Sequence, residues 1–179
     1  MSANSLKYSR SVTQSHPFYN CFAQHVLTIN ELMQKNWGQG VLFGTDFAFS
    51  MDDIEKELAP SDKLKRLTPG PSVDLAFGVS NNSESLFLLA ELKIDVKSRR
   101  GRRINKTELL NKYEQSKYRI TNFADVVVSP LYPIVLGVHD QTEAQRRKIN
   151  QWGLENNGSL KDRTFLPMTE QEFYNQFWS

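Results

Sequence analysis

Two polar stretches lie within apolar segments of this chain, and their side chains could do chemistry. The first is Asp74, in the segment 72–77, and the second is Glu91-Leu92-Lys93, which begins 17 residues further on. Both segments have the composition of β-strands, and alternation along a strand puts Glu91 and Lys93 on one face and Leu92 on the other. Burying two carboxylates and an ammonium group is costly unless they pair with each other or bind a cation. The pattern therefore predicts a polar site on neighbouring strands.

The elements that would position this site follow from hydrophobic periodicity and from capping signals. Helices are expected over 17–37, 52–65, 106–123 and 140–156, and a capping box at Thr169–Glu172 opens a last helix that ends at Trp178. Strands are expected over 41–49, 72–77, 86–94, 134–138 and 164–166, with a hairpin loop at 80–83. The order is helix, three strands, helix, strand and helix. It predicts an α/β fold in which helices flank a mixed central sheet.

This order, together with the two acidic stretches, resembles the PD-(D/E)XK nuclease superfamily, whose fold is the restriction-endonuclease-like three-layer sandwich. Asp74 matches the first acid of the motif, Glu91 the second acid and Lys93 the lysine. Val73 replaces the proline that often precedes the first acid in the family. The resemblance covers about residues 17–138. It predicts a nuclease-like core there, a C-terminal helical extension over 139–179, and a single domain over 1–179.

A second resemblance lies on the helix expected over 106–123. Gln115-Ser116-Lys117-Tyr118 is similar to the Gln-x-x-Tyr element of RecB-type nucleases in this superfamily. The resemblance implies that Gln115 and Tyr118 belong to the catalytic site. The alternative for a four-residue pattern is an ordinary exposed glutamine and a half-buried tyrosine.

The resemblance also implies roles for the residues of the motif. Asp74 and Glu91 would each give one oxygen to Mg²⁺ or Mn²⁺, and the Leu92 carbonyl would give a third, since these ions prefer oxygen ligands. Lys93 would hold the attacking water and offset the charge that builds on the phosphate. The structural alternative is a buried Asp beside a Glu–Lys ion pair without metal.

Positive charge is concentrated just after the motif. Residues 97–106 contain six basic side chains and no acidic one, whereas the rest of the chain has 16 basic and 20 acidic residues, a net charge of −4. Such a cluster suits the phosphates of a nucleic acid, although many charge runs are only solvated segments. The residues expected to bind nucleic acid are Lys97, Arg99, Arg100, Arg102, Arg103 and Lys106.

Composition narrows the class of protein. The 179 residues, 39% of them hydrophobic, suffice for one folded domain with a core. Neither a membrane-spanning run nor an N-terminal secretory signal is expected. A single cysteine, Cys21, forbids an intramolecular disulfide, which favours the reducing cytoplasm.

The sequence thus predicts a Mg²⁺- or Mn²⁺-dependent nuclease that hydrolyses phosphodiester bonds in DNA. A homodimer would suit double-strand cleavage, with one site for each strand. The alternative is a catalytically inactive protein of the same fold that binds nucleic acid or a protein partner, such as an immunity or regulatory subunit.

Overall fold

The computed structural model of the chain describes residues 5–36, 38–59, 70–94, 104–139, 142–154 and 164–179. Seven strands form one mixed sheet in the order β2-β3-β4-β5-β6-β7, and β1 pairs with β4 outside this path. Pairing is antiparallel from β2 to β5 and parallel from β5 to β7. The strands are β1 (Lys7–Tyr8), β2 (Val26–Thr28), β3 (Phe47–Ser50), β4 (Leu75–Ser80), β5 (Ser85–Lys93), β6 (Leu131–Leu136) and β7 (Thr164–Thr169).

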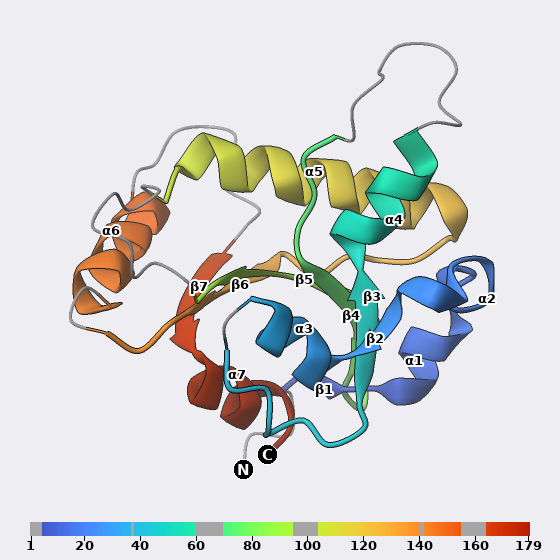
Figure 1. The fold of residues 1–179 in the computed structure, drawn as a ribbon, viewed down its shortest axis with the longest axis horizontal. Coiled ribbons are helices and arrows are strands. Elements are labelled where there is room, and N and C mark those ends of the chain that lie inside the picture. Colours follow the sequence, from blue (N-terminus) through green and yellow to red (C-terminus); the bar gives the residue numbers. More distant parts are fainter. Residues whose placement is uncertain (1–4, 37, 60–69, 95–103, 140–141, 155–163) are drawn as a thin grey trace.

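Helices cover both faces of the sheet (Figure 1). The long α5 and α6 pack on one face through residues such as Leu109, Tyr113 and Ile149, and α3 and α7 pack on the other through residues such as Met33 and Phe173. The prediction of an α/β fold with a mixed sheet between helices is confirmed. The helices are α1 (Arg10–Ser15), α2 (Phe18–Cys21), α3 (Ile29–Lys35), α4 (Met51–Leu58), α5 (Lys106–Phe123), α6 (Thr142–Leu154) and α7 (Glu170–Phe177), with a short 3₁₀ turn η1 (Ala23–His25).

The central strand β5 is apolar on both faces because both of its faces are covered. Phe87 and Leu89 belong to the core on the side of α5, and Leu88 and Leu92 to the core on the side of α7. This alternation puts Glu91 on the α5 side, since it differs from Leu89 by two residues. Leu92 packs away from its two polar neighbours, as the sequence predicts.

The starts of the helices expected at 106 and after the Thr169–Glu172 capping box are confirmed, whereas Asp140, the cap expected for the helix over 140–156, lies outside the described residues. The α5 helix begins at Lys106, after the Asn105 side chain, which accepts hydrogen bonds from the amides of Thr107 and Glu108. The α7 helix begins after the capping box that Thr169 forms with Glu172. Both helices end within one residue of the predicted position, because the apolar stripe and the cap agree.

The prediction of one helix over 17–37 is wrong. The chain there forms α2, η1, β2 and α3 in turn. Phe18 and Phe22 pack on the α5 side of the sheet, whereas Ile29 and Met33 pack on the α7 side. The apolar residues therefore serve two cores, and the chain passes between them through β2. A capping box between Thr28 and Glu31 starts α3 afresh.

The strand predicted over 41–49 is much shorter in the structure. Only Phe47–Ser50 pairs, as β3. Gly40 and Gly44 have positive φ angles of 57° and 56°, which turn the chain out of an extended path. The predicted strand 134–138 lies in β6, shifted to Leu131–Leu136, and the region 139–179 adds β7 to the sheet as well as α6 and α7. No described helix has both the length and the apolar composition that a bilayer span requires.

Candidate active site

The two predicted acids lie opposite each other at the open end of the β4–β5 hairpin. Leu75 and Ala90 are the last pair of the antiparallel ladder, and extending its register by one position puts Asp74 opposite Glu91. Glu91 projects on the α5 side, because Leu89, two residues away in β5, belongs to that core. Asp74 is close enough to α5 for the charge of Lys112 to act on it.

Asp74 sits where the regular ladder between β4 and β5 stops. Its Oδ2 accepts a hydrogen bond of 2.5 Å from the Leu92 amide, and the Val73 amide donates instead to the Ser116 hydroxyl of α5 at 3.0 Å. The Asp74 carboxylate thus occupies a place that a backbone carbonyl would take in a continued sheet. Its orientation is set by the main chain of the motif.

Glu91 is fully buried and strongly asymmetric in its contacts. Its Oε1 lies 2.5 Å from the Lys93 Nζ and 2.7 Å from the Lys112 Nζ of α5. Its Oε2 is also buried, yet it has no hydrogen-bond partner among the described residues. One oxygen is therefore shared by two ammonium groups, while the other has unused capacity to accept a donor or a cation.

Burial and the negative charge of Glu91 act together on Asp74. Desolvation first, and then repulsion by Glu91, raises the pKa of Asp74 to about 7. Burial alone would lower the pKa of Lys112, but attraction to Glu91 and Asp74 outweighs it and the pKa of Lys112 is raised. The site is therefore a pair of carboxylates that disfavour each other's charge, partly neutralised by lysines.

This donor set fits a hard divalent cation. No three His, Cys, Asp or Glu side chains form a metal-holding cluster within the part of the chain that the structure describes. Magnesium does not need three, since it usually keeps several waters and binds proteins through one or two carboxylates. Asp74 and the orphaned Oε2 of Glu91 provide the acceptors, and a cation between them would relieve their repulsion.

The Gln-x-x-Tyr residues lie in different surroundings. A side chain at Gly70 would come within 3.0 Å of the Glu55 Oε1 and 3.3 Å of the Gln115 Nε2, so Gln115 lies at the junction of α4 and α5. Tyr118 is 56% exposed, and no hydrogen bond joins it to Asp74 or Glu91 in the described structure. The structure thus places Gln115 near Gly70 and Glu55, and it gives neither Gln115 nor Tyr118 a hydrogen bond to the two acids among the described residues.

Most of the basic segment cannot be placed. Lys97, Arg99, Arg100, Arg102 and Arg103 lie outside the described residues. Lys106 is described as the first residue of α5, where it is half-buried.

Several charged residues near the acids were not predicted from the sequence. On α4, the Glu55 side chain is 3% exposed and receives two hydrogen bonds from Arg119 of α5, at 2.8 and 3.1 Å, and a third from the Gly70 amide at 3.0 Å. Also on α4, Asp52 accepts a hydrogen bond from Ser72, and its charge adds to the raised pKa of Asp74. One feature of the sequence could have indicated these contacts. Lys112, Gln115 and Arg119 are spaced three and four residues apart, which puts all three along one side of α5.

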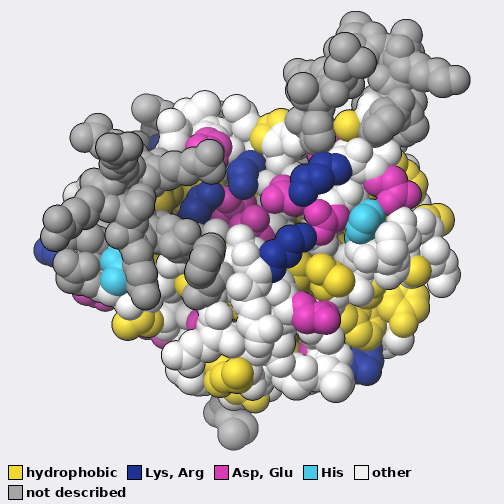
Figure 2. Space-filling view, in the orientation of Figure 1, with side chains coloured by type: hydrophobic (Ala, Val, Ile, Leu, Met, Phe, Trp, Pro, Cys, Tyr) yellow, Lys and Arg dark blue, Asp and Glu magenta, His cyan; other side chains and the backbone are white. Residues whose placement is uncertain are grey.

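These residues give one face of the molecule an alternating charge pattern. Figure 2 shows acidic and basic side chains gathered over the area where α4 and α5 approach the sheet. Asp74 directly precedes β4, Glu91 belongs to β5, and Glu55 belongs to α4, whereas Lys112 and Arg119, two of their basic partners, belong to α5. The helix α5 therefore supplies cations to carboxylates held by the sheet and by α4.

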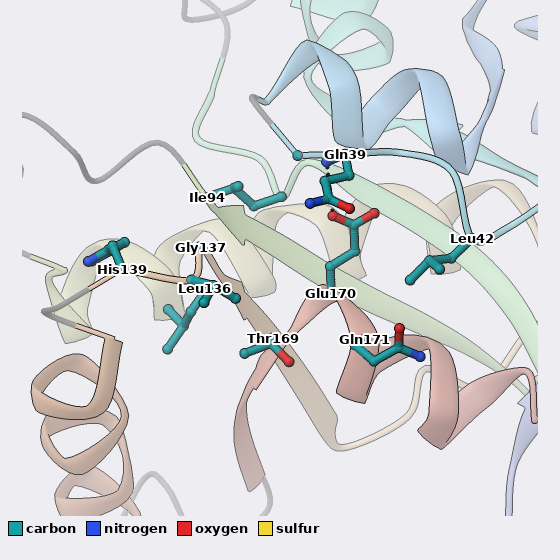
Figure 3. A pocket seen from close by; sticks show the side chains of 11 residues that line it. Gln39, Leu42, Ile94, Leu136, Gly137, His139, Thr169, Glu170 and Gln171 are labelled. Carbon is teal, nitrogen blue, oxygen red and sulfur yellow. Dashed lines mark hydrogen bonds between the residues drawn. The ribbon is translucent and has the colours of Figure 1, made fainter.

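A separate pocket of about 360 Å³ opens on the other side of the sheet, near the ends of β5 and β6 (Figure 3). Glu170, the first residue of α7, projects toward its wall and accepts hydrogen bonds from the amides of Gln39 and Gly40, at 3.0 and 2.9 Å. The Glu170 carboxylate thus ties the segment after α3 to α7. Its oxygens already have donors, so this pocket shows no comparable orphaned carboxylate.

Comparison of the chain with protein-family models, with curated proteins and with solved structures gave no match. The chemistry of the site is therefore inferred from its own side chains.

Proposed function

We propose that this protein is a metal-dependent nuclease that hydrolyses phosphodiester bonds in DNA, with a fold of the restriction-endonuclease type. The observation that carries the proposal is the buried pair formed by Asp74 and Glu91 with Lys93 beside it. The Oε2 of Glu91 has no partner in the described structure, and Asp74 lies opposite Glu91 at the open end of the hairpin. A purely structural ion pair would have no need of a second carboxylate at this position.

Asp74, Glu91 and the Leu92 carbonyl would hold Mg²⁺ or Mn²⁺. The amide and carbonyl of one strand residue point to the same edge, and the Leu92 amide donates to Asp74. The Leu92 carbonyl is thus on the Asp74 side of β5. When bound, the ion supplies a Lewis acid for the phosphate and favours deprotonation of a water.

The chain's own residues supply the remaining chemistry. Lys93 can donate to a water aligned with the phosphorus, and its positive charge offsets the negative charge that grows on the phosphate oxygens in the transition state. Leu92, packed in the core on the α7 side, holds Glu91 and Lys93 in fixed positions on the other face. Gln115, which lies near Gly70 between α4 and α5, would contact the sugar–phosphate backbone.

A second candidate has support from one observation. Two ammonium groups on one oxygen of Glu91 satisfy much of its charge without metal. An inactive protein of the same fold, which binds nucleic acid or a protein partner, would keep such an arrangement. Binding of a divalent cation distinguishes this candidate from the nuclease.

The test is incubation of the protein with plasmid, linear duplex and single-stranded DNA in Mg²⁺, Mn²⁺ or EDTA. We expect cleavage of at least one substrate with metal and none with EDTA. Asp74→Asn, Glu91→Gln and Lys93→Ala should each lower the rate by at least about 100-fold. Glu57→Gln, on the exposed side of α4, is the matched control and should cut normally. Undiminished cleavage by all three site variants would refute the assignment.

A further inference from the structure

Lys112 is the charged neighbour of the site that the motif does not include. Its Nζ lies 2.7 Å from the Oε1 of Glu91, the same oxygen that Lys93 contacts at 2.5 Å. Lys112 comes from α5 rather than from the sheet, and its side chain is 16% exposed. It is therefore close to Glu91 and still in contact with solvent.

The backbone position of Lys112 is fixed by the core. Its neighbour Tyr113 is buried and donates a 2.7 Å hydrogen bond to the Ser129 carbonyl, and one turn further on Ser116 accepts from the Val73 amide. These contacts hold α5 against the sheet on both sides of the strand that bears Glu91. The four-carbon stem of a lysine can nevertheless move its ammonium group by several ångströms without moving the helix.

The balance of charge around Glu91 suggests a role for a mobile Lys112 ammonium group. Glu91 and an ionised Asp74 carry two negative charges, and Lys93 and Lys112 carry two positive charges, so these four side chains balance one another without a metal. Asp52 adds a further negative charge that acts on Asp74 and Lys112. A divalent cation held by Asp74 and the Oε2 of Glu91 would add two positive charges beside the two ammonium groups on the Oε1 of Glu91. Repulsion by the cation would then favour release of an ammonium group from Glu91, and a phosphate of the substrate is an anion that could receive it.

We propose that Lys112 occupies Glu91 while the metal is absent, gives way to the metal, and then binds a phosphate of the nucleic acid. This inference rests on the proposed function. Lys93 is less suited to the exchange, because it lies on the same strand as Glu91 and keeps its place two residues away. Lys112 thereby links metal binding to substrate binding, because the ammonium that the metal releases becomes a substrate contact.

The test compares Lys112→Met with wild type in two measurements that need no turnover. Calorimetry with Mn²⁺ and no DNA should show binding about tenfold tighter in Lys112→Met, because a competing positive charge has been removed. Fluorescence anisotropy with a short DNA duplex in Ca²⁺ should show binding about fivefold to tenfold weaker, because a phosphate contact has been lost. Lys117→Met removes a positive charge from the same helix and should change neither.

Conservative variants separate charge from packing. Lys112→Arg keeps the charge and should hold Mn²⁺ affinity within about threefold of wild type. Should Lys112→Met fail to fold, Lys112→Gln, which can still donate to Glu91, provides the same comparison. Unchanged or weaker Mn²⁺ binding in the neutral variant, or unchanged DNA binding, overturns the inference. If wild type itself neither binds Mn²⁺ nor cuts DNA, the proposed function fails instead, and the two failures are distinguishable.

Discussion

Asp74 and Glu91 face each other across the open end of the β4–β5 hairpin, one held by a backbone amide and the other by two lysines. Neither carboxylate neutralises the other, and both lie in a low-dielectric interior. An arrangement of this kind costs stability in the protein without metal, and that cost can be measured.

The first prediction concerns the stability of the protein in EDTA. The folded state has an Asp74 pKa of about 7, above the ordinary value of 3.8. Because the folded state holds the proton of Asp74 more tightly than the unfolded state does, Asp74 stabilises the fold fully below about pH 4. That contribution to the free energy of unfolding is lost as the pH rises through about 7. Asp74→Asn, which can still accept from the Leu92 amide, should be more stable than wild type at pH 8 by on the order of 2 kcal/mol.

Urea denaturation of both proteins from pH 4 to pH 8 provides the measurement. The gain in the free energy of unfolding should shrink as the pH is lowered toward 4. A difference that stays constant over this range, or an Asn variant that is the less stable one at pH 8, would contradict the account of Asp74.

The second prediction concerns metal binding by the motif. Asp74→Asn and Glu91→Gln each remove a ligand charge and should abolish Mn²⁺ binding in calorimetry. Lys93→Ala should still bind Mn²⁺, because an ammonium group is not a ligand, although it should not cut DNA. Mn²⁺ should raise the melting temperature of the wild-type protein and of Lys93→Ala, but not that of Asp74→Asn or Glu91→Gln. Equal binding by Glu91→Gln and wild type would move the metal away from this site.

The third prediction concerns the contact between α4 and α5. Glu55→Gln leaves Arg119 opposite a neutral side chain in a buried place, and breaking a buried ion pair typically costs about 3–5 kcal/mol. Glu57→Gln, two residues along α4, alters an exposed pair with His25 and should cost less than about 1 kcal/mol. Urea unfolding of the two variants tests this contrast, and similar losses in both would show that the Glu55–Arg119 pair is not a main link between the helices.

Local sequence signals anticipated the hairpin and α5 well. A continuous apolar run leads into Glu91-Leu92-Lys93, which is typical of a strand covered on both faces, and Asn105 caps a helix that has an apolar stripe. The opposition of Asp74 and Glu91 follows once the short loop at 81–84, one residue later than expected, sets the register.

The same reasoning failed where one stretch of chain serves two cores. The residues from Phe18 to Met33 have helical spacing, but they pack on opposite sides of the sheet, and periodicity cannot detect such a division. Lys112 and Glu55 were missed for a related reason. Their partners lie 21 and 64 residues away along the chain, so only the packing of α5 brings them together.

The last prediction concerns the basic segment 97–106, whose charge is known from the sequence. It follows Lys93 and Ile94 in the chain and leads into α5, the helix that carries Lys112 and Gln115. Each contact between a basic side chain and a phosphate releases counterion, so the logarithm of the binding constant should fall with log salt by about 0.9 per contact on duplex DNA.

Replacing Arg99, Arg100, Arg102 and Arg103 with Ala should therefore weaken duplex binding and flatten this slope by about 2 to 4 units, across unrelated DNA sequences. Mn²⁺ affinity should stay near the wild-type value, because the metal ligands are unchanged. Anisotropy titrations from 50 to 300 mM salt would measure the slope for the wild-type protein and for the quadruple variant. The control is Arg147→Ala, which removes a single exposed arginine from α6. A quadruple variant that binds like wild type at every salt concentration would mean that the segment is only solvated, and the phosphate contacts would then have to come from α5 itself.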